Sequence, residues 1–184
     1  QSLLGLMRDC LSRVNLDNRE RFLQILLEEK AQMEEALIPA GHRFVDHRLR
    51  ARFHLADWAK EHTGGISYLL FLRFLLDKVH KDWEGVREDL RRTWAALVNS
   101  RGALANLTAE ASGREAIEAG LWDLLAALPR EEPPEQSWRA QCERGGEGMT
   151  IPAQVNYVGK ALGLAQDGYA FHGSHYVINR YLRT

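Results

Sequence analysis

Apolar side chains recur every three or four residues along most of the chain, and this spacing predicts a series of amphipathic helices. The first is expected over residues 3–14 and the second over residues 17–37, opening with a capping box at Asp17-Asn18-Arg19-Glu20. Pro39 should end the second helix, because proline removes a backbone donor and clashes with the preceding turn. Helical spacing then resumes as one continuous pattern over residues 44–58.

The most apolar helix is expected after Gly64-Gly65, with Ser67 as its cap and apolar residues around most of its circumference. Such a helix must be covered on several sides. Another helix is expected around residues 86–97. A second capping box at Ser112-Gly113-Arg114-Glu115 should open a helix that ends at Pro129, and Ser174 should open a last one.

Two short segments carry the spacing of strands instead. Residues 103–108 alternate imperfectly, whereas residues 151–157 alternate with a period of two, and Pro152 near the start favours an edge position. These strands lack obvious pairing partners, and strand backbone groups must pair somewhere. We therefore predict an α+β, predominantly helical chain whose sheets continue in other sequence. Residues 130–148, rich in proline, glycine and charge, are the clearest candidate linker.

Composition fits a soluble globular protein, with 45% hydrophobic and 27% charged residues and a net charge of −1. No basic excess argues for nucleic acid or an anionic membrane. The longest apolar stretch is well short of the roughly 20 residues that span a bilayer. Cys10 and Cys142 form no disulfide framework, and Cys10 is expected in the core, as in a reducing compartment. Both ends fall inside helical patterns, so we expect a longer parent chain.

Seven histidines raise the question of a metal site. Neither H-E-x-x-H nor H-x-x-E-H occurs, and these patterns give a zinc hydrolase its paired ligands and its base. His172 and His175 lie three apart without an obvious third ligand, and His42 and His47 lie five apart. Structural or solvated histidines are the favoured interpretation, so no catalytic or metal-binding residue is assigned.

Other polar and aromatic groups receive ordinary interpretations. The serines at the predicted helix starts are explained as caps. A basic run at Arg48, Arg50 and Arg52 is interpreted as a solvated helix face. Four tryptophans fall on or beside apolar stripes and are expected in the core; they are Trp58, Trp83, Trp94 and Trp122.

Several stretches resemble one family, the falcilysin-like presequence peptidases of the pitrilysin/insulinase superfamily (subfamily C of peptidase family M16). The most specific is I-P-A-Q-V-N-Y-V-G-K-A at residues 151–161, followed by G-S-H-Y-V-I at residues 173–178. H-T-G-G-I-S-Y-L-L-F-L at residues 62–72 and K-D-W-E-G at residues 81–85 match in the same order. Pro39 and the divergent linker depart from the pattern.

The resemblance implies a zinc metalloendopeptidase of two half-shells that close around a chamber and degrade unfolded peptides. Residues 1–138 would be the end of the third domain, 139–148 a linker, and 149–184 the start of the fourth. The family's zinc ligands and catalytic residues would lie outside this chain, so the fragment itself would bind no zinc and would be inactive. Its implied partners are the other domains, and its implied location is a bacterial cytoplasm or an organelle matrix.

The segment at residues 151–161 would lie in the carboxy-terminal half-shell, where it could line the chamber. The candidate chamber residues are Gln154, Asn156, Tyr157, Gly159 and Lys160. The alternative is that this strand pairs within its own sheet. Two other interpretations of the chain stay open: a free-standing helical interaction module without enzymatic activity, and a small metal-binding protein that uses His172 and His175.

Overall fold

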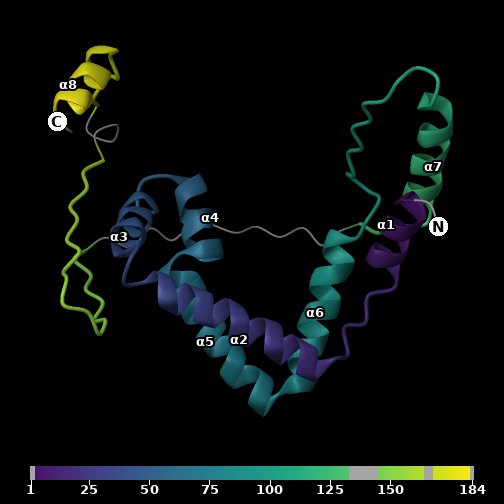
Figure 1. The fold of residues 1–184 in the computed structure, drawn as a ribbon, viewed down its shortest axis with the longest axis horizontal. Coiled ribbons are helices and arrows are strands. Elements are labelled where there is room, and N and C mark those ends of the chain that lie inside the picture. The colour runs from purple at the N-terminus through teal and green to yellow at the C-terminus, as the bar shows by residue number, and fades with distance from the viewer. Residues whose placement is uncertain (1–2, 133–144, 164–167, 183–184) are drawn as a thin grey trace. The chain divides into compact units, whose positions relative to one another are not determined.

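The computed structural model describes residues 3–132, 145–163 and 168–182. Within these ranges the chain forms helices joined by turns and extended segments (Figure 1). The helices are α1 (Leu3–Ser12), α2 (Arg19–Ala36), α3 (Gly41–Arg50), α4 (Leu55–Gly64), α5 (Ile66–Lys81), α6 (Trp83–Leu97), α7 (Arg114–Ala126) and α8 (Ser174–Leu182). No described helix is both long enough and apolar enough to cross a lipid bilayer.

The chain divides into two compact units. The first comprises Gln1–Lys30 and Leu72–Arg139, and the second comprises Ala31–Phe71 and Ala140–Thr184. Helices α2 and α5 each contribute residues to both units.

In the first unit, α1 lies against α7 (Figure 1). The approach is close at Gly120, where an added Cβ would lie 2.6 Å from Leu4 Cδ1. Trp94 of α6 donates its indole N–H to the Leu11 carbonyl at 3.1 Å, which joins α6 to the end of α1. The unit's best buried side chains come from helices far apart in sequence: Leu26, Leu72, Val79, Val86 and Leu124.

In the second unit, α3 packs against α4. The two helices are separated by a turn around Ala51, which is buried. The single helix expected over residues 44–58 is therefore wrong, and His54 is extended between the two helices with φ −132° and ψ 132°. Apolar spacing could not reveal this break, because α3 and α4 both keep a helical period on either side of it.

The predicted helix starts are correct to within a few residues, but the capping side chains differ. Asn18, not Asp17, caps α2, by accepting the Arg21 N–H at 3.0 Å. Gly113 precedes α7 without any side-chain cap, so Ser112 does not have the expected role. At α5 the first-turn N–H of Ser67 donates to the Glu61 carboxylate at 3.0 Å, so a buried carboxylate replaces the expected serine cap.

The two predicted strands are not formed, and the chain bends at Pro152 and Gln154 within the second. Residues 103–108 and 151–157 have no strand assignment, and the described residues include no strand anywhere. A strand needs a neighbour to accept its N–H groups and donate to its carbonyls. The predominantly helical part of the prediction is confirmed, and the α+β part is not.

Several residues expected in the core are exposed. Cys10 lies at the surface, and Trp122 is 65% exposed, whereas Trp58, Trp83 and Trp94 are half-buried. Trp138 and Cys142 lie outside the described residues. Helical spacing predicts which side chains share a face, but it does not say what covers that face.

Candidate functional site

The candidate chamber residues lie in a segment of the second unit that has no regular secondary structure. We call residues 145–160 the strap, because contacts near both of its ends hold it to α3. Gln154, Asn156, Gly159 and Lys160 are exposed, and Tyr157 is half-buried. Within the described part of the chain, residues 154–160 form no backbone hydrogen bond. Their N–H and C=O groups are available to a neighbouring strand.

Tyr157 and Gly159 fix the C-terminal end of the strap. The Tyr157 hydroxyl donates to the Ile38 carbonyl, and its ring covers Gly41 at the start of α3. A Cβ at Gly41 would lie 2.9 Å from Tyr157 Cγ, and one at Gly159 would lie 2.7 Å from Leu49 Cδ1. Both glycines therefore permit contacts that a side chain would block.

Two arginines, one in α3 and one in the turn that follows it, hold the N-terminal end of the strap. Arg48 Nε lies 2.7 Å from Glu147 Oε2, and Arg52 Nη2 lies 3.0 Å from Glu147 Oε1. Arg52 also donates to the Gly145 carbonyl. Both carboxylate oxygens of Glu147 thus lie in ion pairs, and Oε2 also accepts a charge-assisted hydrogen bond from Arg48 Nε, a kind roughly twice as strong as a neutral one.

Arg48 also reaches into the interior of the unit. Its Nη1 donates to Glu61 Oε1 at 3.3 Å and to Ser67 Oγ at 2.8 Å. Glu61 is completely buried, and Gly65 lies directly against its carboxylate. An ionised carboxylate in such a position requires a cationic partner and hydrogen-bond donors. Arg48 and the Ser67 N–H supply them.

The charges of this cluster reinforce one another. Hydrogen bonding to Glu147 raises the pKa of Arg48, against the opposing effect of partial burial, and Glu61 adds to the rise. Hydrogen bonding to Arg48 lowers the pKa of Glu147, and Arg52 lowers it further. The ion pair is therefore fully charged at neutral pH.

This cluster was not predicted from the sequence. Arg48 and Arg52 were expected on a solvated helix face, whereas both form ion pairs with Glu147. Arg50, between them, matches the prediction better: it is exposed and pairs with Asp57 at 3.2 Å. The available signal was the spacing of four, which places Arg48 and Arg52 on one side and Arg50 on another.

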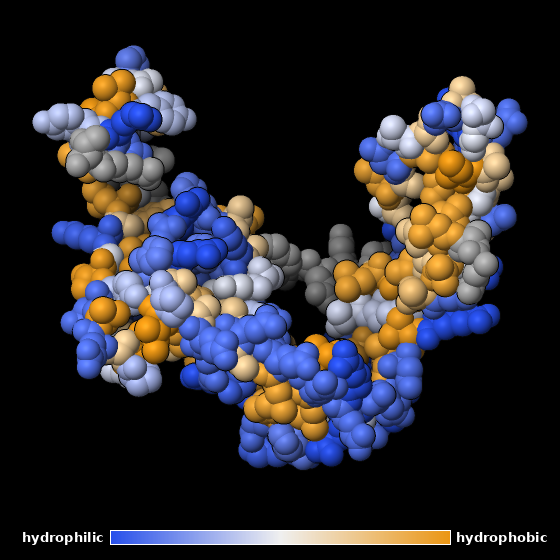
Figure 2. Space-filling model, in the orientation of Figure 1, coloured by the Kyte–Doolittle hydropathy of each residue, from blue (hydrophilic) through white to orange (hydrophobic). Residues whose placement is uncertain are grey.

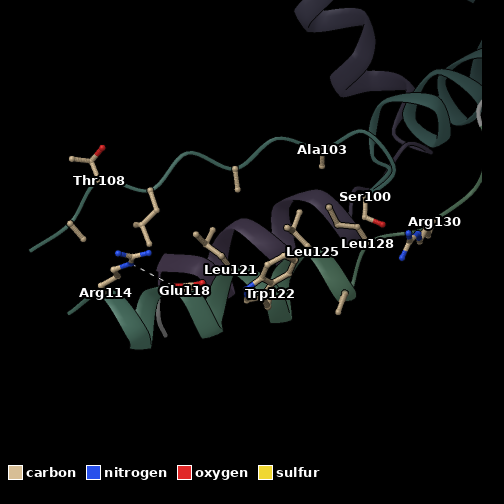
Figure 3. A pocket seen from close by; sticks show the side chains of 14 residues that line it. Ser100, Ala103, Thr108, Arg114, Glu118, Leu121, Trp122, Leu125, Leu128 and Arg130 are labelled. Carbon is tan, nitrogen blue, oxygen red and sulfur yellow. Dashed lines mark ion pairs between the residues drawn. The ribbon is translucent and has the colours of Figure 1, made fainter. Parts of the chain in front are cut away.

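The first unit contains a groove of about 1010 Å³ between α7 and the extended residues 103–109 (Figure 3). Leu121, Leu125 and Leu128 line one side, and Ala103, Ala105 and Leu107 line the other. The only ion pair drawn among its lining residues joins Arg114 and Glu118 at 3.7 Å. These lining residues are mostly apolar and offer no cluster of groups suited to acid–base chemistry.

Among the described residues, the histidine candidates do not lie in a cluster of three metal-ligating side chains. No group of three or more histidines, cysteines or acidic residues lies close enough to hold a metal ion in the part of the chain that the structure describes. His175 uses both ring nitrogens: Nδ1 accepts the His172 N–H at 2.9 Å, and Nε2 contacts the Tyr169 hydroxyl. These residues therefore do not fit the zinc site of a hydrolase, which needs three protein ligands.

Sequence comparison shows which protein family these helices match. Residues 1–75 match the family described as the region associated with peptidases of family M16, subfamily C.

Two curated relatives extend the match along the chain. The sequence is 35% identical over 182 residues to presequence protease 1, chloroplastic/mitochondrial, of Arabidopsis thaliana, which covers 98% of this chain and 17% of that protein. It is 20% identical over 171 residues to protein HypA of Clostridium perfringens (strain 13 / Type A), which covers 93% of this chain and 17% of that protein. The chain is thus a relative of the presequence proteases and corresponds to one segment of such a protein.

Proposed function

We propose that this chain is a non-catalytic, architectural segment of a zinc metalloendopeptidase that degrades unfolded peptides such as presequences. The single observation that carries the proposal is the match of 98% of the chain to 17% of presequence protease 1. The segment forms part of the carboxy-terminal half-shell of the peptide chamber. In this proposal zinc and the catalytic groups belong to other segments of the parent.

Exposed apolar side chains support an architectural role. Large apolar residues lie on the surface of each unit (Figure 2), and α8 is an example, with Tyr176 and Val177 each 71% exposed and Tyr181 79% exposed. In α1, Leu3 is 73% exposed. Soluble monomers rarely leave contiguous apolar faces uncovered, so neighbouring domains of the parent are the natural partners of these helices.

The same exposed faces favour a second candidate, a free-standing helical module that binds another protein. The two candidates differ in what the parent protein does. An assay of peptide hydrolysis separates them, with a quenched fluorescent presequence peptide as substrate. We expect the 184-residue chain to show no turnover with added zinc, and the parent carrying the same segment to show turnover that a chelator abolishes. Chelator-sensitive turnover by the chain alone, or an inactive parent, would contradict the proposal.

The chamber role needs its own test. A photoreactive amino acid placed at Asn156 of the parent, in this chain's numbering, should crosslink to a bound presequence peptide, and excess unlabelled peptide should suppress the crosslink. The matched control is Leu104, which is 95% exposed but belongs to the first unit. Crosslinking at Leu104 with none at Asn156 would place the peptide elsewhere.

A further inference from the structure

The strap is held to α3 at two places that differ in chemistry. At residues 157–159 the contacts are mostly apolar and depend on the close approach of Tyr157 to Gly41. At residues 145–147 the contacts are ionic and polar, through Arg48 and Arg52. Between them, the one backbone hydrogen bond within the described strap residues is local, from the Ala153 N–H to the Ile151 carbonyl at 2.9 Å. The two ends therefore determine where the middle of the strap lies.

At the ionic end, Arg48 is held by groups other than Glu147. Arg48 Nη1 is already bound to Glu61 Oε1 and Ser67 Oγ, so the guanidinium has little freedom left. Its Nε then faces the strap and needs no further ordering to bind Glu147. Because a planar guanidinium presents its donors in a rigid fork, fixing one side of the fork also fixes the other.

Glu61 is the buried half of this arrangement. Its side chain is 1% exposed, whereas Arg48 and Glu147 are 32% and 35% exposed. One Glu61 oxygen, Oε2, has no hydrogen-bond partner among the described residues. The carboxylate therefore depends on Arg48 for compensation of its charge, and Arg48 cannot leave Glu61 to follow a displaced strap without a large cost.

We propose that Arg48 and Arg52 form a latch: their ion pairs with Glu147 hold the strap on α3. Buried Glu61 supports the latch by holding the Arg48 side chain in position. Arg48 is thus a positioning residue for the segment from Gln154 to Lys160. The importance of this position for peptide hydrolysis rests on the proposed chamber role. The existence of the latch does not.

A spin label on the strap tests the latch directly. The label is attached at Gln154→Cys in a chain whose native cysteines are replaced by serine, and the mobile fraction of its spectrum is measured. Exposed ion pairs are individually weak, so we expect Glu147→Gln to raise the ratio of mobile to immobile label by roughly threefold. Arg52→Gln should give a smaller rise, because the pair between Arg48 and Glu147 remains.

Arg50→Gln is the matched control, since Arg50 belongs to the same helix but pairs with Asp46 and Asp57 instead of the strap. It should leave the label unchanged. Raising the salt concentration should mobilise the label in the unsubstituted chain and have no effect in Glu147→Gln. Equal mobility in Glu147→Gln and Arg50→Gln, or a label insensitive to salt, would overturn the latch.

Arg48→Gln separates the two functions of the arginine. It should mobilise the label and also lower the melting temperature, because Glu61 loses its cation, whereas Glu147→Gln should mobilise the label with little change in melting. A fall in melting temperature without mobilisation would mean that Arg48 only stabilises the helices, which would refute its role in the latch.

Peptide hydrolysis by the parent tests the link to function. With Glu147→Gln we expect a several-fold higher KM and a nearly constant kcat, and with Arg50→Gln no change. If Glu147→Gln makes the label mobile but leaves KM unchanged, the latch proposal stands and the chamber role is refuted. If the label stays immobile in Glu147→Gln, the latch proposal is refuted, whatever the KM of the parent.

Discussion

Gly65→Ala is the substitution for which the structure makes the sharpest prediction. Gly65 lies between α4 and α5, with φ −104° and ψ −158°, a conformation open to alanine. The obstacle is steric. A Cβ at this position would fall inside contact distance of the Glu61 carboxylate and 2.8 Å from the Glu61 carbonyl oxygen. Since the backbone conformation itself suits alanine, the loss of stability must come from these two clashes: the Glu61 carboxylate must move aside, and the backbone near its carbonyl must shift slightly.

The size of the loss follows from what Glu61 would give up. Moving its carboxylate weakens the hydrogen bond from the Ser67 N–H, at 3.0 Å, and the ion pair with Arg48, at 3.3 Å. A hydrogen bond to a charged group contributes about 1.5–3 kcal/mol, and breaking a buried pair outright costs about 3–5 kcal/mol. Because the pair is displaced and not removed, we expect Gly65→Ala to lower the free energy of unfolding by about 2–4 kcal/mol.

Gly64→Ala is a control from the neighbouring position. Gly64 is the last residue of α4, and an added Cβ there meets nothing within 4 Å. Alanine is favoured over glycine in a helix, so this substitution should be neutral or stabilising by up to about 1 kcal/mol. Urea unfolding followed by circular dichroism would measure both changes, with melting temperature as a second reading.

A double-mutant cycle identifies the cause. If Gly65→Ala acts mainly through the Glu61 carboxylate, the same substitution should cost clearly less in a chain that already carries Glu61→Ala, where only the clash with the backbone carbonyl of residue 61 remains. Equal stability of the Gly64→Ala and Gly65→Ala variants would refute the steric argument. A full loss in the Glu61→Ala background would refute the role assigned to the carboxylate.

Two further predictions concern the strap. Arg48 lowers the pKa of Glu147, so the stability contributed by this pair should be present above the ordinary carboxyl pKa and lost as the pH falls through the lowered value; the mobile fraction of the strap label should rise over that acidic range and stay flat near neutrality. Gly159→Ala should mobilise the same label, because its Cβ would meet Leu49, whereas Gly173→Ala, with nothing within 4 Å, should not; equal spectra for the two variants would contradict the packing described here.

Helix positions were the most predictable feature of the chain. The ends of α1, α2 and α8 follow from apolar spacing and from Pro39, because those signals act within a few residues. Capping was less predictable. Asn18 caps α2 in place of Asp17, whose carboxylate instead accepts hydrogen bonds from Trp83 and Arg87 at the start of α6. An acidic residue near a helix start can cap or bind elsewhere, and the choice depends on a distant helix.

The kinship with presequence proteases was also contained in the sequence, in the stretches at residues 62–72 and 151–161. The candidate chamber residues stay a prediction. The strand expected at residues 151–157 is not formed: the chain bends at Pro152 and Gln154, and alternation cannot supply the partner that a strand needs.

The amino-acid sequence by itself determined the helices, the apolar stripes and the kinship with presequence proteases, because each depends on local spacing or on ordered motifs. Only the tertiary structure decided which partners Glu61, Arg48 and Glu147 have. Arg48 is separated from Glu61 by 13 positions and from Glu147 by 99, and the three meet because α4 folds back on α3 and the strap crosses it. Arg48 joins the buried Glu61 to Glu147, since a charge removed from water must find its partners inside the protein.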